Sequence, residues 1–268
     1  MTLVHWDEVA GGQNLGEAAG AVRIGLQRLR IAPGRTVATR AAQSAEEELV
    51  VVLSGSGELR HGGIGTAIEA GDTIVSTPGV RAHALAAVTE PLDVLVFGTR
   101  SREAPDDAPA ERAPSIVKLA DVEGDFGGSW KRLGREGGAS RSGLNLGVIP
   151  PDDEGAPPHC HDAEEELYVV LAGSGTLELW GGPQPGQPAP TEPEETHPLR
   201  PGHVVSRRPG TRIAHCLRSG PDGMTYLAYG TREPNDVCYY PRSQKIFWRG
   251  LGLIARLEAL DYFDGEPT

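Results

Sequence analysis

The sequence contains two copies of one pattern, and this duplication constrains the fold more than any other feature of the chain. The segment EEELVVVLSGSGEL at 46–59 returns as EEELYVVLAGSGTL at 164–177. Further along, GDTIVSTPGVRAHAL from Gly71 returns as GHVVSRRPGTRIAHCL from Gly202, and VFGTR then returns as AYGTR. Because the blocks keep their order, the chain is predicted to form two domains of the same fold.

Each copy has the pattern of short strands. Alternating runs such as residues 26–31 end at turns such as Pro33-Gly34, and the 36 glycines and 22 prolines make up about a fifth of the chain, against a usual share of roughly 12%. This favours an all-β fold, an antiparallel sandwich or barrel in each copy, with few helices. The segment 247–260 is the best candidate for a longer helix, and its two glycines leave a strand as an equal alternative.

The composition also suggests where the domains begin and end. Residues 101–115 are polar and rich in proline, which is typical of a linker. We therefore expect a first domain at 1–100 and a second at 116–268, the latter including an aromatic and apolar C-terminal tail that docks across the two barrels or across a dimer interface. Most of the extra length of the second copy lies at 181–200, whose proline content predicts a long exposed hairpin loop.

The second copy carries a set of residues suited to metal binding. His159 and His161 are two positions apart, so on a strand they share one face. Glu166 follows closely, and His215 comes after a Pro-Gly turn. Three imidazoles and a carboxylate suit Fe, Mn, Co, Ni, Cu or Zn better than Mg or Ca. The sequence predicts one divalent transition metal per chain.

These spacings resemble the cupin superfamily. Its first motif is a glycine, an H-x-H pair, three or four residues, a glutamate, six residues and a glycine, and residues 159–173 match it from the histidine onward. Gly202, Pro209 and His215 match the second motif, although the spacing from proline to histidine is one residue longer and the closing asparagine is absent. Glu164 and Glu165 are weaker candidates for the carboxylate ligand because they fit the spacing less well.

The resemblance implies a bicupin, two tandem double-stranded β-helix (jelly-roll) barrels, with a complete metal motif only in the C-terminal one. In the first copy, Glu48 takes the position of the carboxylate and His83 that of the last histidine, whereas Ala41 and Gln43 replace the paired histidines. We expect Gln43, Glu48 and His83 to form a polar cluster or a metal-free ligand pocket instead of a tight metal site.

Other residues near the motif allow two interpretations each. Arg207, Arg208 and Arg212 are expected to pair with acidic residues, and the alternative is that they bind a carboxylate or phosphate of a substrate. Large aromatic residues of the second copy are expected in the core more than at the barrel mouth. They are Trp130, Tyr168 and Trp180.

The charge and the cysteine content of the chain indicate which classes of partner and which compartment to expect. A net charge of -12 and a pI near 5.1 leave no basic face for nucleic acid or for an anionic membrane. The sequence has neither a long apolar run nor a secretory signal, and Cys160, Cys216 and Cys238 cannot all pair, so we expect a cytoplasmic protein. A small-molecule ligand or substrate is expected, and the resemblance implies a homodimer.

An open metal with these ligands supports several reactions. We favour a metal-dependent enzyme acting on a small oxygenated organic molecule by dioxygenase-type chemistry, with Glu166 also available for proton transfer. A Lewis-acid sugar isomerase or lyase is one alternative. A binding or storage module with a non-catalytic metal is the other, since this fold hosts many functions.

Overall fold

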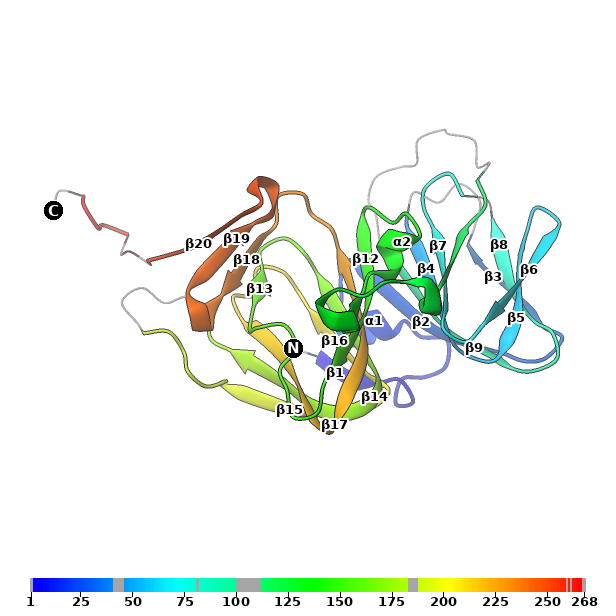
Figure 1. The fold of residues 1–268 in the computed structure, drawn as a ribbon, viewed down its shortest axis with the longest axis horizontal. Coiled ribbons are helices and arrows are strands. Elements are labelled where there is room, and N and C mark those ends of the chain that lie inside the picture. The colour runs from blue at the N-terminus through cyan, green and yellow to red at the C-terminus, as the bar shows by residue number, and fades with distance from the viewer. Residues whose placement is uncertain are drawn as a thin grey trace.

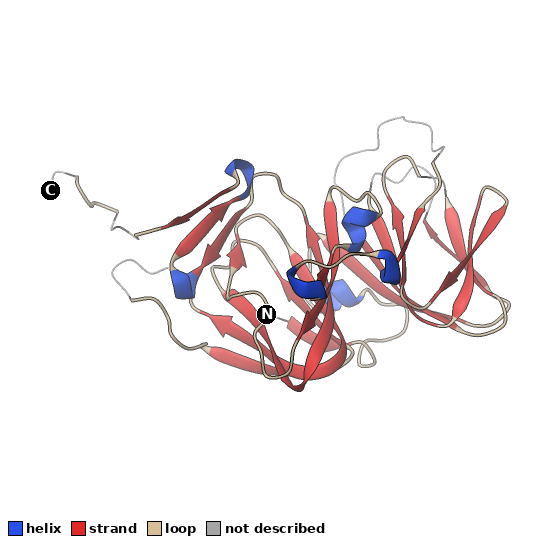
Figure 2. Cartoon of the chain, viewed as in Figure 1, coloured by secondary structure: helices blue, strands red, loops and turns tan. Residues whose placement is uncertain are grey.

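The computed structural model describes residues 2–40, 46–80, 82–99, 112–182, 188–258, 260 and 262–266. Strands dominate this part of the chain, and its α-helices are two single turns, α1 (Leu15–Ala18) and α2 (Leu133–Glu136) (Figure 2). The all-β prediction is therefore confirmed. Of the helices described, none combines the length and apolar character needed to cross a membrane.

The first barrel is made of two antiparallel sheets, in the orders β10-β7-β4-β9-β2 and β3-β8-β5-β6. Their side chains enclose an apolar core that includes Val50, Leu59, Ile74 and Leu85. The strands are β2 (Ile24–Ile31), β3 (Thr36–Arg40), β4 (Glu48–Ser54), β5 (Ser56–His61), β6 (Ile64–Glu69), β7 (Asp72–Ser76), β8 (His83–Ala87), β9 (Leu92–Thr99) and β10 (Ser115–Lys118).

The second barrel is built on a larger sheet, in the order β1-β16-β14-β17-β12-β11, with β15 paired to β14. Its strands are β1 (Thr2–His5), β11 (Trp130–Lys131), β12 (Ser142–Ile149), β14 (Glu166–Trp180), β15 (Glu195–Leu199), β16 (His203–Arg207) and β17 (Ala214–Thr231). The loop predicted at 181–200 is thus shorter than expected, because residues 195–199 pair with 175–179, and residues 183–187 lie outside the described residues.

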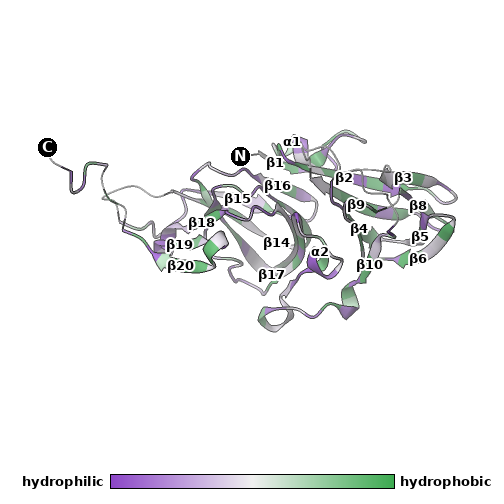
Figure 3. Ribbon diagram, turned by 90° about the horizontal axis from the view of Figure 1, so that it is seen from above, coloured by the Kyte–Doolittle hydropathy of each residue, from purple (hydrophilic) through white to green (hydrophobic). Residues whose placement is uncertain are grey.

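A four-stranded sheet, β13-β18-β19-β20, adjoins the second barrel at the end away from the first (Figures 1 and 3). Its strands are β13 (Cys160–His161), β18 (Val237–Tyr240), β19 (Lys245–Trp248) and β20 (Leu253–Arg256). The longer helix considered for 247–260 is wrong, since Gly252 adopts φ 61° and turns the chain back into a hairpin. Beyond β20 the described residues Leu260, Tyr262 and Phe263 are 58%, 88% and 67% exposed in the single chain, and the docking expected for the tail stays a prediction.

Two strands cross the domain boundaries expected from the sequence. Thr2–His5 (β1) pairs with β16 of the second barrel, and Ser115–Lys118 (β10) pairs with β7 of the first. An apolar core also joins the barrels, because residues alternate along β4 and β14: one face points into its own barrel and the other toward the neighbouring barrel. Phe97 and Tyr229 stack in this shared core, with ring centroids 5.0 Å apart.

Two buried glutamates reinforce the contact between the barrels. Glu165 accepts hydrogen bonds from the backbone N–H groups of Val22, Arg23 and Ile24, at 2.9, 2.7 and 3.1 Å. Glu47, its counterpart in the repeat, accepts bonds from the backbone of 140–142. Both side chains belong to residues that are 0% exposed. Each barrel therefore holds the start of one strand of the other barrel, β2 or β12, through a carboxylate.

Candidate metal centre

The structure brings the four predicted ligands together inside the second barrel. His159 and His161 lie at β13, Glu166 begins β14, and His215 lies on β17, joined to His159 by a β-bridge. The Nε2 atoms of His159, His161 and His215 lie 3.7, 3.5 and 3.1 Å from one oxygen, Glu166 Oε2. His159, His161 and Glu166 all present ligand atoms within 4.8 Å of one another.

The donor set fits a transition metal. Glu166 Oε2 is buried and has no hydrogen-bond partner among the described residues, although three ring nitrogens surround it. Such an orphaned buried oxygen is rare in proteins unless an ion or water satisfies it. Ligand atoms about 2.1 Å from one metal lie roughly 3 to 3.4 Å from one another, which is close to the observed spacing. Small adjustments of side chains would therefore complete the coordination.

Two of the imidazoles are oriented by a bond at their other nitrogen. His159 Nδ1 donates to the carbonyl of Pro157 at 2.8 Å, and His161 Nδ1 donates to Asp236 Oδ2 at 2.6 Å. Both bonds occupy Nδ1 and direct the other nitrogen, Nε2, at Glu166, where it binds a metal once it carries no proton. Asp236 is itself 1% exposed and accepts the backbone N–H groups of residues 163 and 164 at Oδ1.

The electrostatics of the site follow from burial and from its carboxylates. Burial works against a charged His161, yet the charge of Glu166 and the bond to Asp236 raise its pKa to about 9. Burial and the neighbouring His159 lower the pKa of His215 to about 3. Burial opposes ionisation of Glu166, but the three imidazoles hold its pKa well below the usual range. A cation is therefore stabilised where the four side chains meet.

Tyr168 completes this cluster and is a residue whose role sequence reasoning missed. It lies two positions after Glu166 on β14 and so faces the same interior. Its hydroxyl lies 2.9 Å from His215 Nε2, and the residue is 6% exposed. Burial and the charge of Glu166 raise its pKa well above the usual range, so it stays a neutral phenol. The two-residue period of a strand beginning at Glu166 was the sequence signal that could have placed Tyr168 beside the ligands.

Comparison with known proteins shows which solved structures share this architecture. No protein-family model and no curated protein sequence matches the chain. Solved structures do: an oxalate decarboxylase from Lactobacillus farciminis is 11% identical, with 87% of this chain and 86% of that one covered and a TM-score of 0.61. A variant of the Bacillus subtilis oxalate decarboxylase is 12% identical, with 88% and 78% covered and a TM-score of 0.62.

A cupin 2 conserved barrel domain protein from Leptotrichia buccalis is 12% identical, with 86% of this chain and 96% of that one covered and a TM-score of 0.55. The chain has the bicupin fold. The two copies seen in the sequence are the two cupin barrels, arranged side by side along the long axis of the molecule (Figure 3). These structural similarities establish the fold alone, and the function has to be argued from the site.

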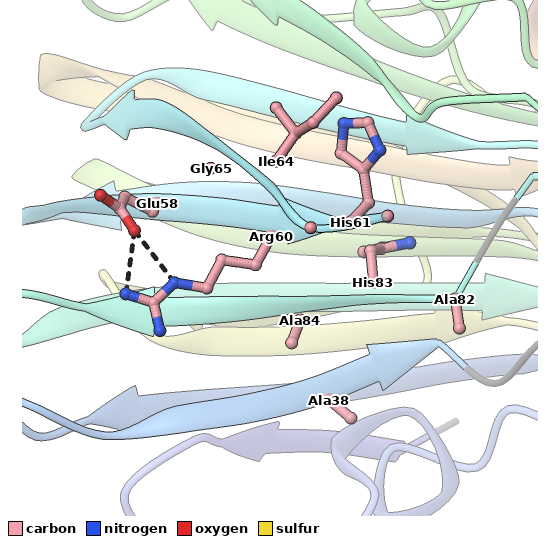
Figure 4. Close-up of a pocket in the computed structure, with 11 residues that line it drawn as sticks. Ala38, Glu58, Arg60, His61, Ile64, Gly65, Ala82, His83 and Ala84 are labelled. Atoms are coloured by element: carbon pink, nitrogen blue, oxygen red, sulfur yellow. Dashed lines mark hydrogen bonds and ion pairs between the residues drawn. The ribbon is translucent and has the colours of Figure 1, made fainter.

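The first barrel of the bicupin keeps a reduced version of the site. His83 Nε2 lies 3.4 Å from Glu48 Oε1 and 3.4 Å from Ser76 Oγ. Gln43, the third residue expected there, lies outside the described residues. A pocket of about 680 Å³ lies beside His83, and His61 also lines it (Figure 4). Glu58 and Arg60 pair with each other across 2.9 Å in the same wall.

The weaker carboxylate candidates of the bicupin motif have other partners. Glu165 binds the backbone of residues 22–24, as described above. Glu164 accepts the backbone N–H of Glu233 at 2.9 Å and pairs closely with Arg249. A second acidic group, His161 with Glu164 and Asp236, also has ligand geometry. Because its carboxylates already accept these hydrogen bonds, the geometry favours Glu166.

Proposed function

We propose that this bicupin is a divalent-metal-dependent enzyme that acts on a small oxygenated organic molecule, with dioxygenase-type chemistry as the leading reaction. The observation that carries the proposal is the convergence of three imidazole Nε2 atoms on the unpartnered oxygen of Glu166. His159, His161, Glu166 and His215 would hold the metal. An open-shell metal in such a site activates dioxygen and a chelating substrate together, whereas Zn acts as a Lewis acid.

The side chains of the site supply the other requirements of such a reaction. Glu166 is the one carboxylate of the four proposed ligands, so we assign proton transfer to it. The neutral phenol of Tyr168 offers a hydrogen-bond donor at the same point. The recess beside the ligands is lined by Cys160 and His215, among others, and leaves no room even for a water molecule. A substrate therefore requires the surrounding side chains to move.

The fold neighbours widen the choice of metals and substrates to be tested. One Bacillus subtilis oxalate decarboxylase structure, which has a TM-score of 0.57 to this chain, is of a protein with Mn(II) centres. Manganese therefore joins iron as a metal to be tested first. Small carboxylic acids join catechols and diketones as test substrates, with release of carbon dioxide as a second measurement beside oxygen uptake.

Elemental analysis of the purified protein is the first test. We expect about one transition metal per chain, a large loss in His161→Ala, and unchanged content in the matched first-barrel variant His83→Ala. Oxygen uptake is then compared for protein loaded with Fe(II), Mn(II) or Zn(II). Uptake with an open-shell metal and none with Zn supports the oxygenase. Tightly bound Zn without oxygen uptake on any catechol, diketone or small acid would overturn it, and two metals per chain would refute the single site.

A further inference from the structure

Arg207 is a buried cation beside the metal centre, and we propose that it binds the carboxylate group of a small acid, the substrate class of this site. The residue ends β16 and is the direct cross-strand partner of Glu166 on β14, so the two side chains share the interior face of the barrel. Arg207 is 6% exposed and lines the same recess as Glu166 and His215.

The guanidinium of Arg207 has hydrogen-bonding capacity left for a ligand. Nη2 donates to the carbonyl of Ile213 at 2.7 Å, while Nε is buried and has no partner. The ion pairing expected for this arginine from the sequence is not found, because no carboxylate in the described part of the chain lies within 4.0 Å of it. A buried cation without a counter-ion is unfavourable, so an anion arriving in the recess would be stabilised.

The charges of the centre also call for an anion. Glu166 carries one negative charge, and Arg207 one positive charge. The three imidazoles must be neutral to bind a metal. Asp236, which accepts a hydrogen bond from His161, adds a second negative charge, so a divalent cation added to this set leaves a net charge of +1 in a buried site. A ligand that offers a carboxylate offsets this charge, and its planar oxygens suit the donors of a guanidinium.

The first barrel provides an internal comparison. Ser76 is the cross-strand partner of Glu48, as Arg207 is of Glu166. A serine there bonds the retained histidine, His83, and carries no charge. The arginine therefore occurs in the barrel with the full ligand set and is replaced by serine in the other. No need of the β-barrel itself explains a buried cation at this position.

The two other arginines predicted near His215 have different surroundings. Arg208 also lines the recess, but it is exposed and its Nε donates to the carbonyl of Gly20 at 2.6 Å. Arg212 is exposed, adopts φ 59° and does not line the recess. Substitution of Arg212 is therefore a matched control, because it removes the same charge from the same segment without changing the lining of the recess.

The test measures ligand binding to Co(II)-loaded protein. Binding is monitored through the change in the visible absorption of the metal. Glycolate is the probe, glycolamide is its neutral counterpart, and inorganic phosphate is a second anion. We expect glycolate to shift the spectrum with saturation, and glycolamide to bind far more weakly. Arg207→Met should weaken glycolate binding roughly 10- to 100-fold at unchanged metal content, whereas Arg212→Met should bind as the wild type does.

Arg207→Lys keeps the charge but removes the Nε donor, and it gives a second measurement if the Met variant does not fold. Wild-type affinity for glycolate in either variant, or tighter binding of phosphate than of glycolate, would overturn the proposal. The inference rests on the proposed metal-dependent function, and the two fail differently. Absence of bound Co(II) refutes the metal centre, while bound Co(II) without a response to Arg207 substitution refutes the carboxylate site alone.

Discussion

Replacing Asp236 with asparagine tests how far the metal centre depends on a residue that is not a ligand. The carboxylate accepts the proton of His161 Nδ1 at 2.6 Å and the backbone N–H groups of Ala163 and Glu164 at 3.0 Å each. Asparagine can keep the backbone bonds with its carbonyl oxygen. Its amide N–H₂ then faces His161, and two donors meet where one donor and one acceptor met before.

The expected magnitude follows from the tautomer of His161. To accept from the new amide, the ring must move its proton from Nδ1 to Nε2, the atom that lies 3.5 Å from Glu166 Oε2. A protonated Nε2 cannot bind a metal. Losing such an orienting partner typically weakens metal binding about 10- to 100-fold, or roughly 1.4 to 2.7 kcal/mol. The fold should be preserved, because both backbone bonds of Asp236 remain.

The assay is competition for the metal with a chelating dye, at constant pH, on wild type and Asp236→Asn. Asp162→Asn is the matched control, since Asp162 directly follows His161 and is exposed. Thermal unfolding of the metal-free proteins shows whether both variants are folded. A folded Asp236→Asn protein with wild-type metal affinity would refute the role assigned to this hydrogen bond.

Two further predictions concern protons and stability. Because the pKa of metal-free His161 is about 9, a metal must displace a proton from this residue below that pH. The apparent metal affinity, measured by the same competition assay, should therefore rise about tenfold per pH unit up to about pH 9 and level off above it. A flat profile from pH 7 to 9 would contradict this. Glu165→Gln should lower the free energy of unfolding in urea by about 2 to 3 kcal/mol, since one N–H of residues 22–24 loses its acceptor, whereas the exposed Glu266→Gln should have no measurable effect.

The barrels and the four candidate ligands could be predicted because their signals are local or repeated. The strands alternate over short runs, and the H-x-H pair needs only the two-residue period of a strand to share a face. The apolar run LVVVL of β4 also indicates a strand buried on both faces, which the prediction of a simple barrel did not include. Both of its faces are buried, one in the barrel core and one between the barrels. An apolar run without alternation is the expected pattern for such a strand.

Asp236 could not be predicted because nothing near it in the sequence indicates its partner. It lies 75 positions from His161 and is brought there by the pairing of β13 with β18. The burial of Arg207 could not be predicted for a similar reason. The three arginines of this segment are indistinguishable in the sequence until the register of β16 against β14 is known. Composition also did not distinguish the two parts of the tail: residues 237–256 form strands beside the second barrel, whereas the described apolar residues beyond them are exposed.

The exchange of edge strands between the barrels has a consequence for the order in which the chain is assembled. β1 precedes the other strands, yet its partner β16 begins at His203, so β1 cannot pair until about 200 further residues have been made. The first barrel likewise stays incomplete until β10 has followed the linker. Such long-range pairing slows folding, so the closure of the second barrel by β1 is expected to be a late step, after the first barrel has its own strands.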